Sequence, residues 1–449
     1  MAAPVGTHLV DEQSDLAATS DLDFFSVPPT QISISSGHWA CVQSKNNLDD
    51  NGPWSFELNS GPYYVQLAKN YLYLKVKLVQ TSAAGDTDIS VADDKIGPIN
   101  LFASTFFKSL RVYLGSKLIS DSGDLYAYRA LLETELNFDK SVKETGHLKV
   151  ALYSQDRPPD HLEDFSNEGL KERVGWFIES NEVEMMAPLH SDLFNSQKLL
   201  PTNSKLRIEL SRNEPDFFLQ NYNIAANQTR KYAVRVVDMK WYIRLMDLAR
   251  SAHLAIEGVL LQTPIKIPIR RVQLTRLSVP RESLRTPHST IFNGEIPRRV
   301  VVGMVERAAF IGSKEKNPFC FKPFGIKEIY LNAGGVIYPR DHLQTDFKKN
   351  GFFRAYLQLL ESMGLGYPQN HSCAISPQLY KSGMCLFAFD LTPSETDGSF
   401  WDLSRQGPTT LEATLSEPLP QAIEVIIFAE FDGLIRVDRN REAHLNYMV

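Results

Sequence analysis

The sequence has few cysteines, no long apolar run and no excess of basic charge. Four cysteines in 449 residues are too few for a disulfide framework, and their spacing matches no metal site. The net charge is −6 at neutral pH, so the composition lacks the basic balance that favours nucleic-acid binding. Apolar runs such as residues 425–429 are far too short to cross a bilayer. These absences predict a chain that folds in a reducing compartment and does not span a membrane.

The sequence signatures of common enzymes are also missing. It contains no phosphate-binding Gly-rich loop, dinucleotide fingerprint, nucleophile elbow or His-Glu-x-x-His zinc motif. Two pairs, His161 with Glu163 and His190 with Asp192, resemble part of a cupin metal set, but neither has a second histidine two residues away. We therefore expect no enzymatic activity, no small-molecule substrate, and no metal or cofactor.

What the chain does have is a repeated order of features. In the first half, a short strand pair at 110–119 precedes a helix at 125–136, and in the second half a strand pair at 329–337 precedes a helix at 353–360. Both strand pairs contain Tyr-Leu followed by a turn of small residues, and both helices contain an aromatic-Arg-Ala core. Matches in the same order at a shifting offset indicate one structural unit used twice, although two short hairpins can also resemble each other by chance.

The two helices are expected to be half-buried, because their apolar residues recur at helical spacing. The two apolar stripes are Leu125, Tyr128, Leu132 and Leu136 in the first helix and Phe353, Tyr356, Leu357 and Leu360 in the second. Asp121 or Ser122 is the candidate N-cap of the first helix, and Asn350 is the candidate N-cap of the second.

Elsewhere, alternating apolar and polar residues predict many short strands. These segments are 54–58, 71–79, 183–193, 205–212, 232–246, 266–279, 298–305, 384–391, 411–415 and 423–438. Only two helices of any length are expected, and the charged stretch 140–173 is expected to be mostly loop. The pattern predicts an all-β protein built as a double jelly roll, with two eight-stranded antiparallel β-sandwiches in tandem and one short helix in a crossover of each half.

The expected domain organisation follows from these strands. Residues 1–22 are polar and are expected to form a flexible N-terminal arm. The first jelly roll is expected to cover 23–247 and to open with a short apolar anchor. The second jelly roll is expected to cover 248–441, and 442–449 would be a C-terminal tail.

Two charged clusters are candidates for contacts outside the chain. The first is a basic stretch made of Lys266, Arg270, Arg271 and Arg276. Its charges alternate with apolar residues, so it is either the solvated face of a strand or a non-specific phosphate contact that weakens with salt. The second cluster, at the end of the last strand, is made of Asp438, Arg439, Asn440 and Arg441. It can cap the sheet or pair with a neighbouring subunit, and we favour the subunit interface.

A carbohydrate-binding, lectin-like jelly roll is an alternative of a different class. Such sites stack sugars on exposed aromatic rings. The large rings available for this are Trp39, Trp54, Trp176, Trp241 and Trp401. Trp241 lies inside the last strand of the first half and is expected to be in the core.

Several segments carry a resemblance to one protein family. They are 25–31, 36–39, 291–302, 316–319, 389–393, 429–432 and 437–441. These segments resemble the hexon-like major capsid proteins of Polinton, or Maverick, elements and of adintoviruses, with relatives left in animal genomes. The matching segments span nearly the whole chain, from about residue 24 to 441.

The resemblance implies a double jelly roll with its barrels side by side. It also implies that three copies form a pseudo-hexameric capsomer and that capsomers tile an icosahedral shell around a double-stranded DNA genome. The partners implied are the chain itself and a minor capsid or penton protein at the vertices, with at most weak, non-specific genome contact. The location implied is the virion capsid, assembled inside the host cell. A domesticated host copy of a capsid gene remains an alternative.

Overall fold

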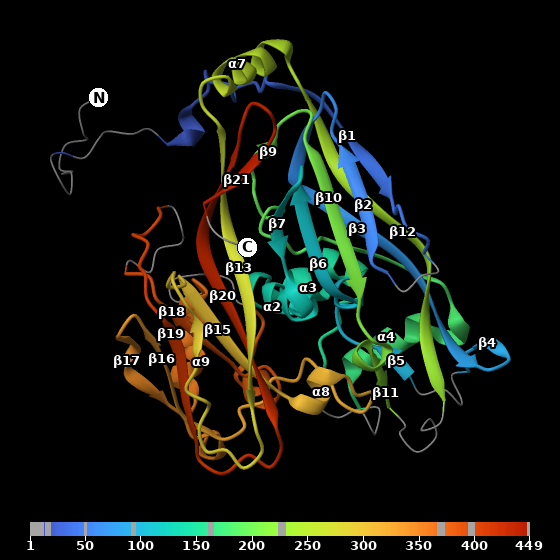
Figure 1. The fold of residues 1–449 in the computed structure, drawn as a ribbon, viewed down its shortest axis with the longest axis vertical. Coiled ribbons are helices and arrows are strands. Elements are labelled where there is room, and N and C mark those ends of the chain that lie inside the picture. The colour runs from blue at the N-terminus through green and yellow to red at the C-terminus, as the bar shows by residue number, and fades with distance from the viewer. Residues whose placement is uncertain are drawn as a thin grey trace.

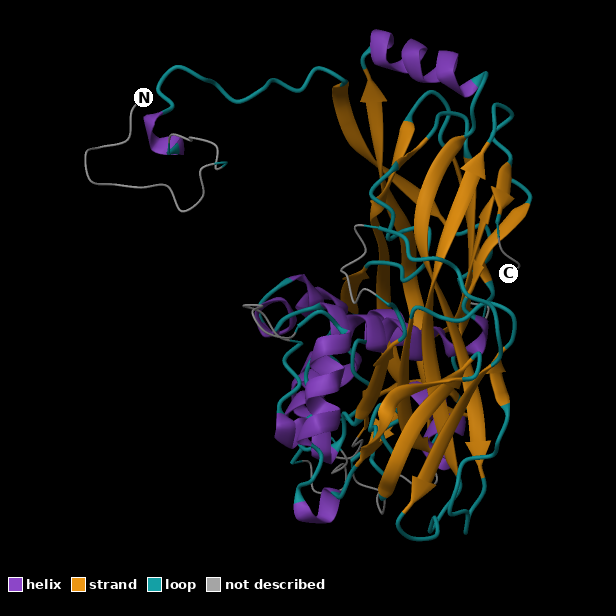
Figure 2. Ribbon diagram, turned by 90° about the vertical axis from the view of Figure 1, so that its left-hand side faces the viewer, coloured by secondary structure: helices purple, strands orange, loops and turns teal. Residues whose placement is uncertain are grey.

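The computed structural model describes residues 13, 19–48, 52–90, 96–159, 166–222, 230–365, 373–393 and 400–446. Most of the predicted N-terminal arm, and both His161 and Glu163, lie outside these residues. Within them, the chain forms two β-sandwiches that lie side by side, with helices grouped between and beside them (Figures 1 and 2). Strands make up 43% of the protein and helices 21%.

Eight strands build the first sandwich. They are β1 (Ile34–Gln43), β2 (Trp54–Asn59), β3 (Tyr64–Ser82), β6 (Phe107–Leu114), β7 (Lys117–Asp121), β8 (Val183–Ala187), β10 (Lys205–Arg212) and β12 (Lys231–Leu248). One sheet has the order β1-β12-β3-β8, and the other has the order β2-β10-β6-β7. Short strands extend these sheets or pair nearby: β4 (Gly85–Asp88), β5 (Ile96–Pro98), β9 (Leu199–Leu200) and β11 (Leu219–Asn221).

Eight further strands build the second sandwich. They are β13 (Ile265–Val279), β14 (Thr290–Phe292), β15 (Arg299–Glu306), β16 (Ile326–Ala333), β17 (Val336–Gln344), β18 (Leu386–Asp390), β19 (Thr409–Leu415) and β20 (Ile423–Val437). The sheet orders are β13-β20-β15-β18 and β14-β19-β16-β17. The segment predicted as a tail contributes β21 (Ala443–Leu445), which pairs with β20.

The two sandwiches have the same strand connectivity. When the eight strands of each half are numbered in chain order, both halves have one sheet of order 1-8-3-6 and one of order 2-7-4-5. All the pairings between these strands are antiparallel. The double jelly roll and the internal repeat predicted from the sequence are therefore confirmed.

The helices lie in the connections between strands. They are α1 (Phe102–Thr105), α2 (Tyr126–Asn137), α3 (Lys140–Glu144), α4 (Glu168–Trp176), α5 (Pro215–Phe218), α7 (Arg250–Leu260), α8 (Arg307–Ile311), α9 (Phe353–Ser362) and α10 (Pro377–Ser382). Single turns of 3-10 helix occur at η1 (Ser20–Leu22), η2 (Gly123–Leu125), η3 (His147–Ala151), η4 (Ile178–Ser180) and η5 (Phe347–Lys349). The two repeat helices, α2 and α9, both follow the fifth strand of their half.

Several local predictions were wrong. The expectation of only two sizeable helices missed α4 and α7, and the strand predicted over 183–193 ends at Ala187. The cap prediction for Ser122 was wrong, because Ser122 Oγ accepts a hydrogen bond from the Leu110 N–H at 2.8 Å. Asp121 accepts one from the Gly123 N–H at 2.9 Å, at the start of the η2 turn that precedes α2. Asn350 instead accepts one from Lys381 Nζ at 2.6 Å. Helix α2 continues directly from the η2 turn and has no side-chain cap.

The last strands of the two halves show how burial follows the fold. In β12, buried Trp241 and Ile243 alternate with half-buried Lys240 and Tyr242, as expected for a sheet with one face on the core. In β20, seven residues in a row, 423–429, are buried. Both faces of β20 are covered in that stretch. One face packs inside its own sandwich, and on the other Phe428 and Ile426 lie toward α2, whereas Glu424 lies 3.7 Å from Arg307 of α8.

Candidate functional site: the junction between the barrels and the exposed surfaces

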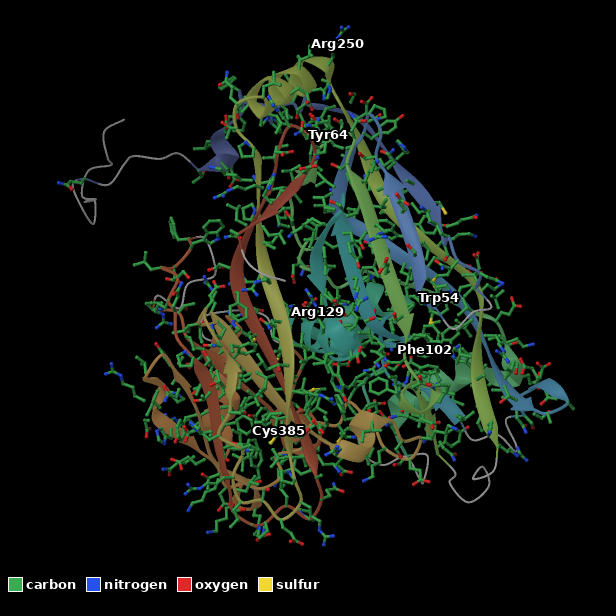
Figure 3. All side chains as sticks on the ribbon, viewed as in Figure 1. Trp54, Tyr64, Phe102, Arg129, Arg250 and Cys385 are labelled. Carbon is green, nitrogen blue, oxygen red and sulfur yellow. The ribbon has the colours of Figure 1, made fainter. Side chains whose placement is uncertain are left out.

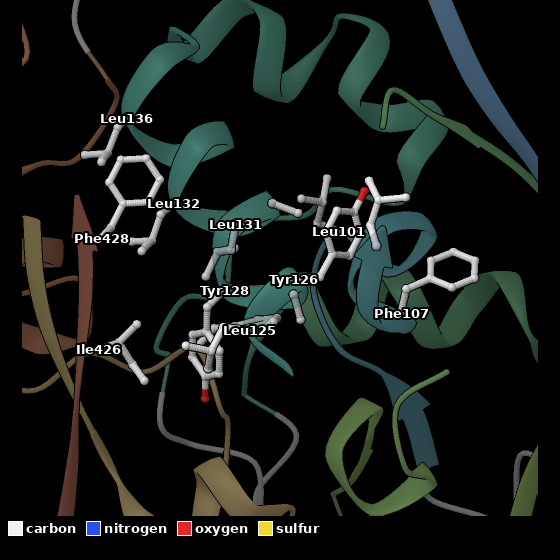
Figure 4. Packing of buried hydrophobic residues seen from close by; sticks show 14 of the residues in the cluster. Leu101, Phe107, Leu125, Tyr126, Tyr128, Leu131, Leu132, Leu136, Ile426 and Phe428 are labelled. Carbon is white, nitrogen blue, oxygen red and sulfur yellow. The ribbon is translucent and has the colours of Figure 1, made fainter. Parts of the chain in front are cut away.

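Helix α2 belongs to the first sandwich but is buried between the two. On one side of α2, Leu132 and Leu136 lie toward Phe428 of β20 in the second sandwich (Figure 4). On the other side, Tyr126 lies toward Leu101 of the first sandwich (Figure 4). Every residue of α2 except the last is buried. The predicted half-buried helix is therefore a fully buried element that joins the two hydrophobic cores.

A buried ionic cluster lies on α2 near the centre of the molecule (Figure 3). The Arg129 guanidinium lies 2.8 Å from the Glu133 carboxylate and 2.6 Å from the Asp192 carboxylate. Asp192 also accepts a hydrogen bond from the backbone N–H of Val272 in β13, at 3.0 Å. His190 Nδ1 lies 2.8 Å from Glu133. Burial alone would raise the pKa of Glu133, but the charge of Arg129 and the hydrogen bond with His190 lower it to about 2.

Two more polar contacts cross the junction. Lys143 donates to the Glu135 carboxylate at 2.7 Å and to the backbone carbonyl of Cys373 at 2.6 Å. Asn317 of the second half donates to the Asp156 carboxylate at 3.0 Å. Because these charged side chains are buried and paired, loss of one partner would leave the other unsatisfied in the interior. These buried contacts therefore link the two sandwiches to each other.

Sequence reasoning did not find this junction. The available signal was the aromatic-Arg-Ala core with a glutamate four residues after the arginine, Arg129 and Glu133. The same core in α9 contains Arg354, which is exposed and pairs with Asp341 at 2.6 Å. The motif thus marks equivalent helices, but burial of its arginine depends on what packs against the helix.

The predicted subunit cluster at residues 438–441 forms the turn between β20 and β21. Arg441 donates to the Thr202 carbonyl at 2.7 Å and to the Glu257 carboxylate at 2.7 Å, so it binds the first sandwich and α7 within the chain. Asp438 accepts a hydrogen bond from His444, which lowers the pKa of Asp438. Arg439 and Asn440 are exposed, so they are the members of the cluster that remain available for the predicted subunit contact.

The predicted basic stretch lies along β13, and most of its cations have partners within the chain. Arg270 lies 3.6 Å from Asp432, and Arg271 lies 2.9 Å from Glu295. The Arg276 guanidinium lies over the Phe310 ring, 5.0 Å from its centre. Lys266 is exposed. This arrangement matches the solvated strand face that the sequence left open as an alternative to phosphate contact.

The candidate metal ligands are mostly committed to other contacts. His190 and Asp192 belong to the buried ionic cluster, where they face Glu133 and Arg129. In the described part of the chain, one group of three side chains brings its possible ligand atoms within 4.8 Å of one another: Asp438, Glu442 and His444. This group is mostly exposed. The Asp438 carboxylate already accepts a hydrogen bond from the backbone N–H of Asn440 at 2.9 Å.

The tryptophans divide into core and surface. Trp54 and Trp241 are fully buried, whereas Trp176 and Trp401 are exposed at separate places. Trp39 lines a hollow of about 480 Å³ on the outer face of the β1-β12-β3-β8 sheet. The other residues that line this hollow are Tyr71, His147, Val150, Met186, Pro188 and Tyr242. The lining is dominated by aromatic and apolar surface.

No protein-family model matches the chain. The sequence is 26% identical over 431 residues to the uncharacterized protein F54H12.2 of Caenorhabditis elegans, covering 94% of this chain and 100% of the relative. A solved structure of the Sputnik virophage matches with a TM-score of 0.64 at 10% identity, covering 98% of this chain and 94% of that one. The chain has the double jelly-roll fold of viral major capsid proteins.

Two further solved structures support this fold assignment. The mavirus major capsid protein matches with a TM-score of 0.56 at 12% identity, over 98% of this chain and 97% of that one. The Faustovirus major capsid protein matches with a TM-score of 0.58 at 10% identity, over 94% and 92%. The similarity therefore covers both sandwiches. Among the described residues, no helix has the length and hydropathy required for a membrane span.

Proposed function

We propose that this chain is a major capsid subunit with a structural, non-enzymatic role. In this proposal three copies form a pseudo-hexameric capsomer, and capsomers tile an icosahedral shell around double-stranded DNA. One observation carries the proposal: two sandwiches of identical connectivity lie side by side in one chain, and the similarity to viral major capsid proteins extends over nearly its full length. Three such chains in a ring would present six barrels to their neighbours.

The physical basis of the proposed activity is shape and surface contact. A ring of identical subunits uses heterologous contacts, in which one flank of a copy meets the opposite flank of the next. Obligate contacts of this kind commonly bury about 2,000 Å² or more. The buried ionic junction through Arg129 and Asp192 supports this role, because it links the two barrels whose surfaces would make the lattice contacts.

The finer identity is also part of the proposal. The sequence segments 291–302 and 389–393 support an origin in Polinton or Maverick elements or adintoviruses. A separate minor capsid protein would fill the vertices, and the assembled protein would reside in the virion capsid. Genome contact would be weak and salt-sensitive, through the predicted basic stretch of Lys266, Arg270, Arg271 and Arg276, in which Lys266 and Arg276 are exposed.

The test is the oligomeric state of the purified chain. Size-exclusion chromatography with light scattering is expected to give the mass of three chains, and negative-stain images are expected to show hexagonal particles. A species that remains monomeric across salt, pH and protein concentration would contradict the proposal.

A second candidate function is a capsid-derived protein that an animal host has put to another use. The observation that favours it is the nematode relative, which matches over its whole length. Nuclease treatment of sedimented particles from expressing cells separates the two. Protected DNA inside the particles supports the viral capsid, whereas capsomers that never protect DNA support the host-derived protein.

A further inference from the structure

The junction inside the chain has a counterpart on the surface. Helix α2 and the η2 turn that leads into it follow the fifth strand of the first sandwich. The η2 turn contacts β13, and α2 lies against β20, so this segment packs on the first and eighth strands of the second sandwich. Helix α9 follows the fifth strand of the second sandwich. The strands equivalent to β13 and β20 in the first sandwich are β1 and β12. Of two equivalent contacts, the chain therefore makes one, between the η2–α2 segment and β13 and β20. The two surfaces of the other, α9 and the face of β1 and β12, do not meet within the chain.

The equivalent positions of α2 and α9 differ in burial. When the two aromatic-Arg-Ala cores are aligned, Phe353 takes the place of Tyr128, and Leu357 takes the place of Leu132. Tyr128 is 2% exposed and Leu132 1%, because both face the second sandwich. Phe353 is 58% exposed and Leu357 51%. On α9 these two apolar side chains, one helical turn apart, have no covering element in the described chain.

The face that would receive them is apolar and hollowed. Trp39 of β1 and Tyr242 of β12 point to the outer side of their sheet and line the hollow of about 480 Å³, together with Tyr71 and Met186. In the second sandwich the same side of β20 carries Phe428, which α2 covers. The outer face of β1 and β12 thus corresponds in place and in chemistry to a face that is already an interface in the chain.

We propose that α9 of one copy docks on the outer face of β1 and β12 of a second copy, with Phe353 and Leu357 entering the hollow beside Trp39. This inference rests on the proposed function, because it assigns the surface through which copies join. The occupant is a second copy of this chain rather than an unrelated partner, since the contact repeats one that the chain already makes between its own halves.

The positions of the two surfaces exclude docking within one chain. In Figure 1, α9 lies on the left flank, α2 lies in the centre, and β1 and β12 lie on the right flank. A contact between opposite flanks is heterologous and runs head to tail around a ring. Charge also fits: the exposed Glu361 follows Leu357 by one turn on α9, and Arg244 lies 5.9 Å from the Trp39 ring on the receiving face.

A cysteine cross-link tests this contact directly. Cys41 is exposed in β1 and pairs with Tyr242 across the strands, so a native thiol borders the hollow. In the Leu357→Cys variant, mild oxidation is expected to produce disulfide-linked dimers and trimers on a non-reducing gel. Leu357→Cys combined with Cys41→Ser is expected to give only monomer. The matched control is Leu254→Cys on α7, which is 59% exposed and is expected to give no such ladder.

A second measurement uses variants that keep the fold. Phe353→Ser and Leu357→Ser change exposed side chains, so the thermal melting point of the monomer is expected to stay near wild type. Each is expected to weaken association by about 10-fold or more, because each removes a buried apolar side chain from the contact. Sedimentation velocity across a concentration series measures this change.

The outcomes separate this inference from the proposed function. Trimers that form without a Leu357–Cys41 cross-link, and that Phe353→Ser and Leu357→Ser leave intact, would overturn the docking and leave the capsid function standing. A protein that stays monomeric would overturn both. A cross-link ladder together with weakened association in the serine variants supports the docking.

Discussion

The Asp192 carboxylate of the first sandwich accepts a hydrogen bond from the backbone N–H of Val272 in the second, at 3.0 Å. Val272 lies in β13, which pairs with β20 on one side only, so its other edge has backbone groups without a strand partner. An uncovered strand edge invites pairing with other chains. Asp192 satisfies one of these groups, and Arg129 in turn neutralises the carboxylate.

The first prediction concerns that arginine. Arg129→Met is expected to lower the free energy of unfolding by about 3–5 kcal/mol, because Glu133 and Asp192 would remain buried without their cation. The control is Arg354→Met at the equivalent position of α9. Arg354 is exposed, and its replacement is expected to change stability by at most about 0.5 kcal/mol. Urea unfolding measures both, and equal losses in the two variants would contradict the assigned role of Arg129.

The second prediction concerns acid stability. The pKa of Glu133 is about 2 in the folded protein, below its ordinary value of 4.5. A lowered folded-state pKa stabilises the protein above the unfolded pKa, and this stability is lost as the pH falls from about 4.5 toward 2. The loss from this group is about 3 kcal/mol. Unfolding curves at stepwise lower pH are expected to show it.

Glu133→Gln is the variant that isolates this effect. It is expected to be less stable than wild type at pH 6 and to lose less stability than wild type below pH 4.5. Exposed Glu361→Gln is the control and is expected to keep the wild-type pH profile. A Glu133→Gln profile parallel to that of wild type would show that other carboxylates account for the acid sensitivity.

The third prediction concerns a tight contact between the two halves at Gly383 and Pro159. A Cβ atom added at Gly383 would lie 2.2 Å from Pro159 Cγ of the first half. Gly383→Ala is therefore expected to destabilise the protein by about 1–3 kcal/mol. Gly175→Ala in α4 meets no atom within 4 Å and is expected to be neutral or slightly stabilising. Thermal unfolding distinguishes them, and Pro159→Ala is expected to rescue Gly383→Ala in part.

The fourth prediction concerns thiol reactivity. Cys41 is exposed, and the other three cysteines are buried. Burial also raises the pKa of Cys373 and of Cys385, which disfavours their thiolates. In the dissociated, folded monomer a thiol reagent is expected to modify one cysteine rapidly, and after denaturation it is expected to modify four. Fast modification that persists in Cys41→Ser would contradict this assignment.

The strand architecture was largely predictable because period-two alternation is a local property of the sequence. The prediction for 205–212 matches β10 residue for residue, and 423–438 matches β20 within one residue at its end. The internal repeat predicted that the two halves of the chain share one fold. Helix α4 was missed because its charges and two glycines resemble a loop, although its Asn167 cap was a usable signal: the side chain accepts from the Leu170 N–H at 3.0 Å.

The contact surfaces were less predictable because they depend on what packs against each element. Tyr128 and Phe353 hold the same place in two similar helices, yet one is buried and the other exposed. No local pattern distinguishes them. Arg441 appears in a mixed-charge turn, and its partners Thr202 and Glu257 are distant in sequence. Trp39 could be identified as an aromatic of interest, but its neighbours in the hollow come from several separate segments.

The unequal use of α2 and α9 gives the molecule two flanks that cannot substitute for each other. One flank carries the uncovered helix, and the other carries the receiving sheet. In the docking that we propose, a copy with an altered α9 still accepts a neighbour on β1 and β12 but offers none in return. Such a copy is competent on one side only. Mixed with wild-type protein, it leaves the rings that contain it unclosed, so a minor fraction of it is expected to lower the particle yield of the whole mixture.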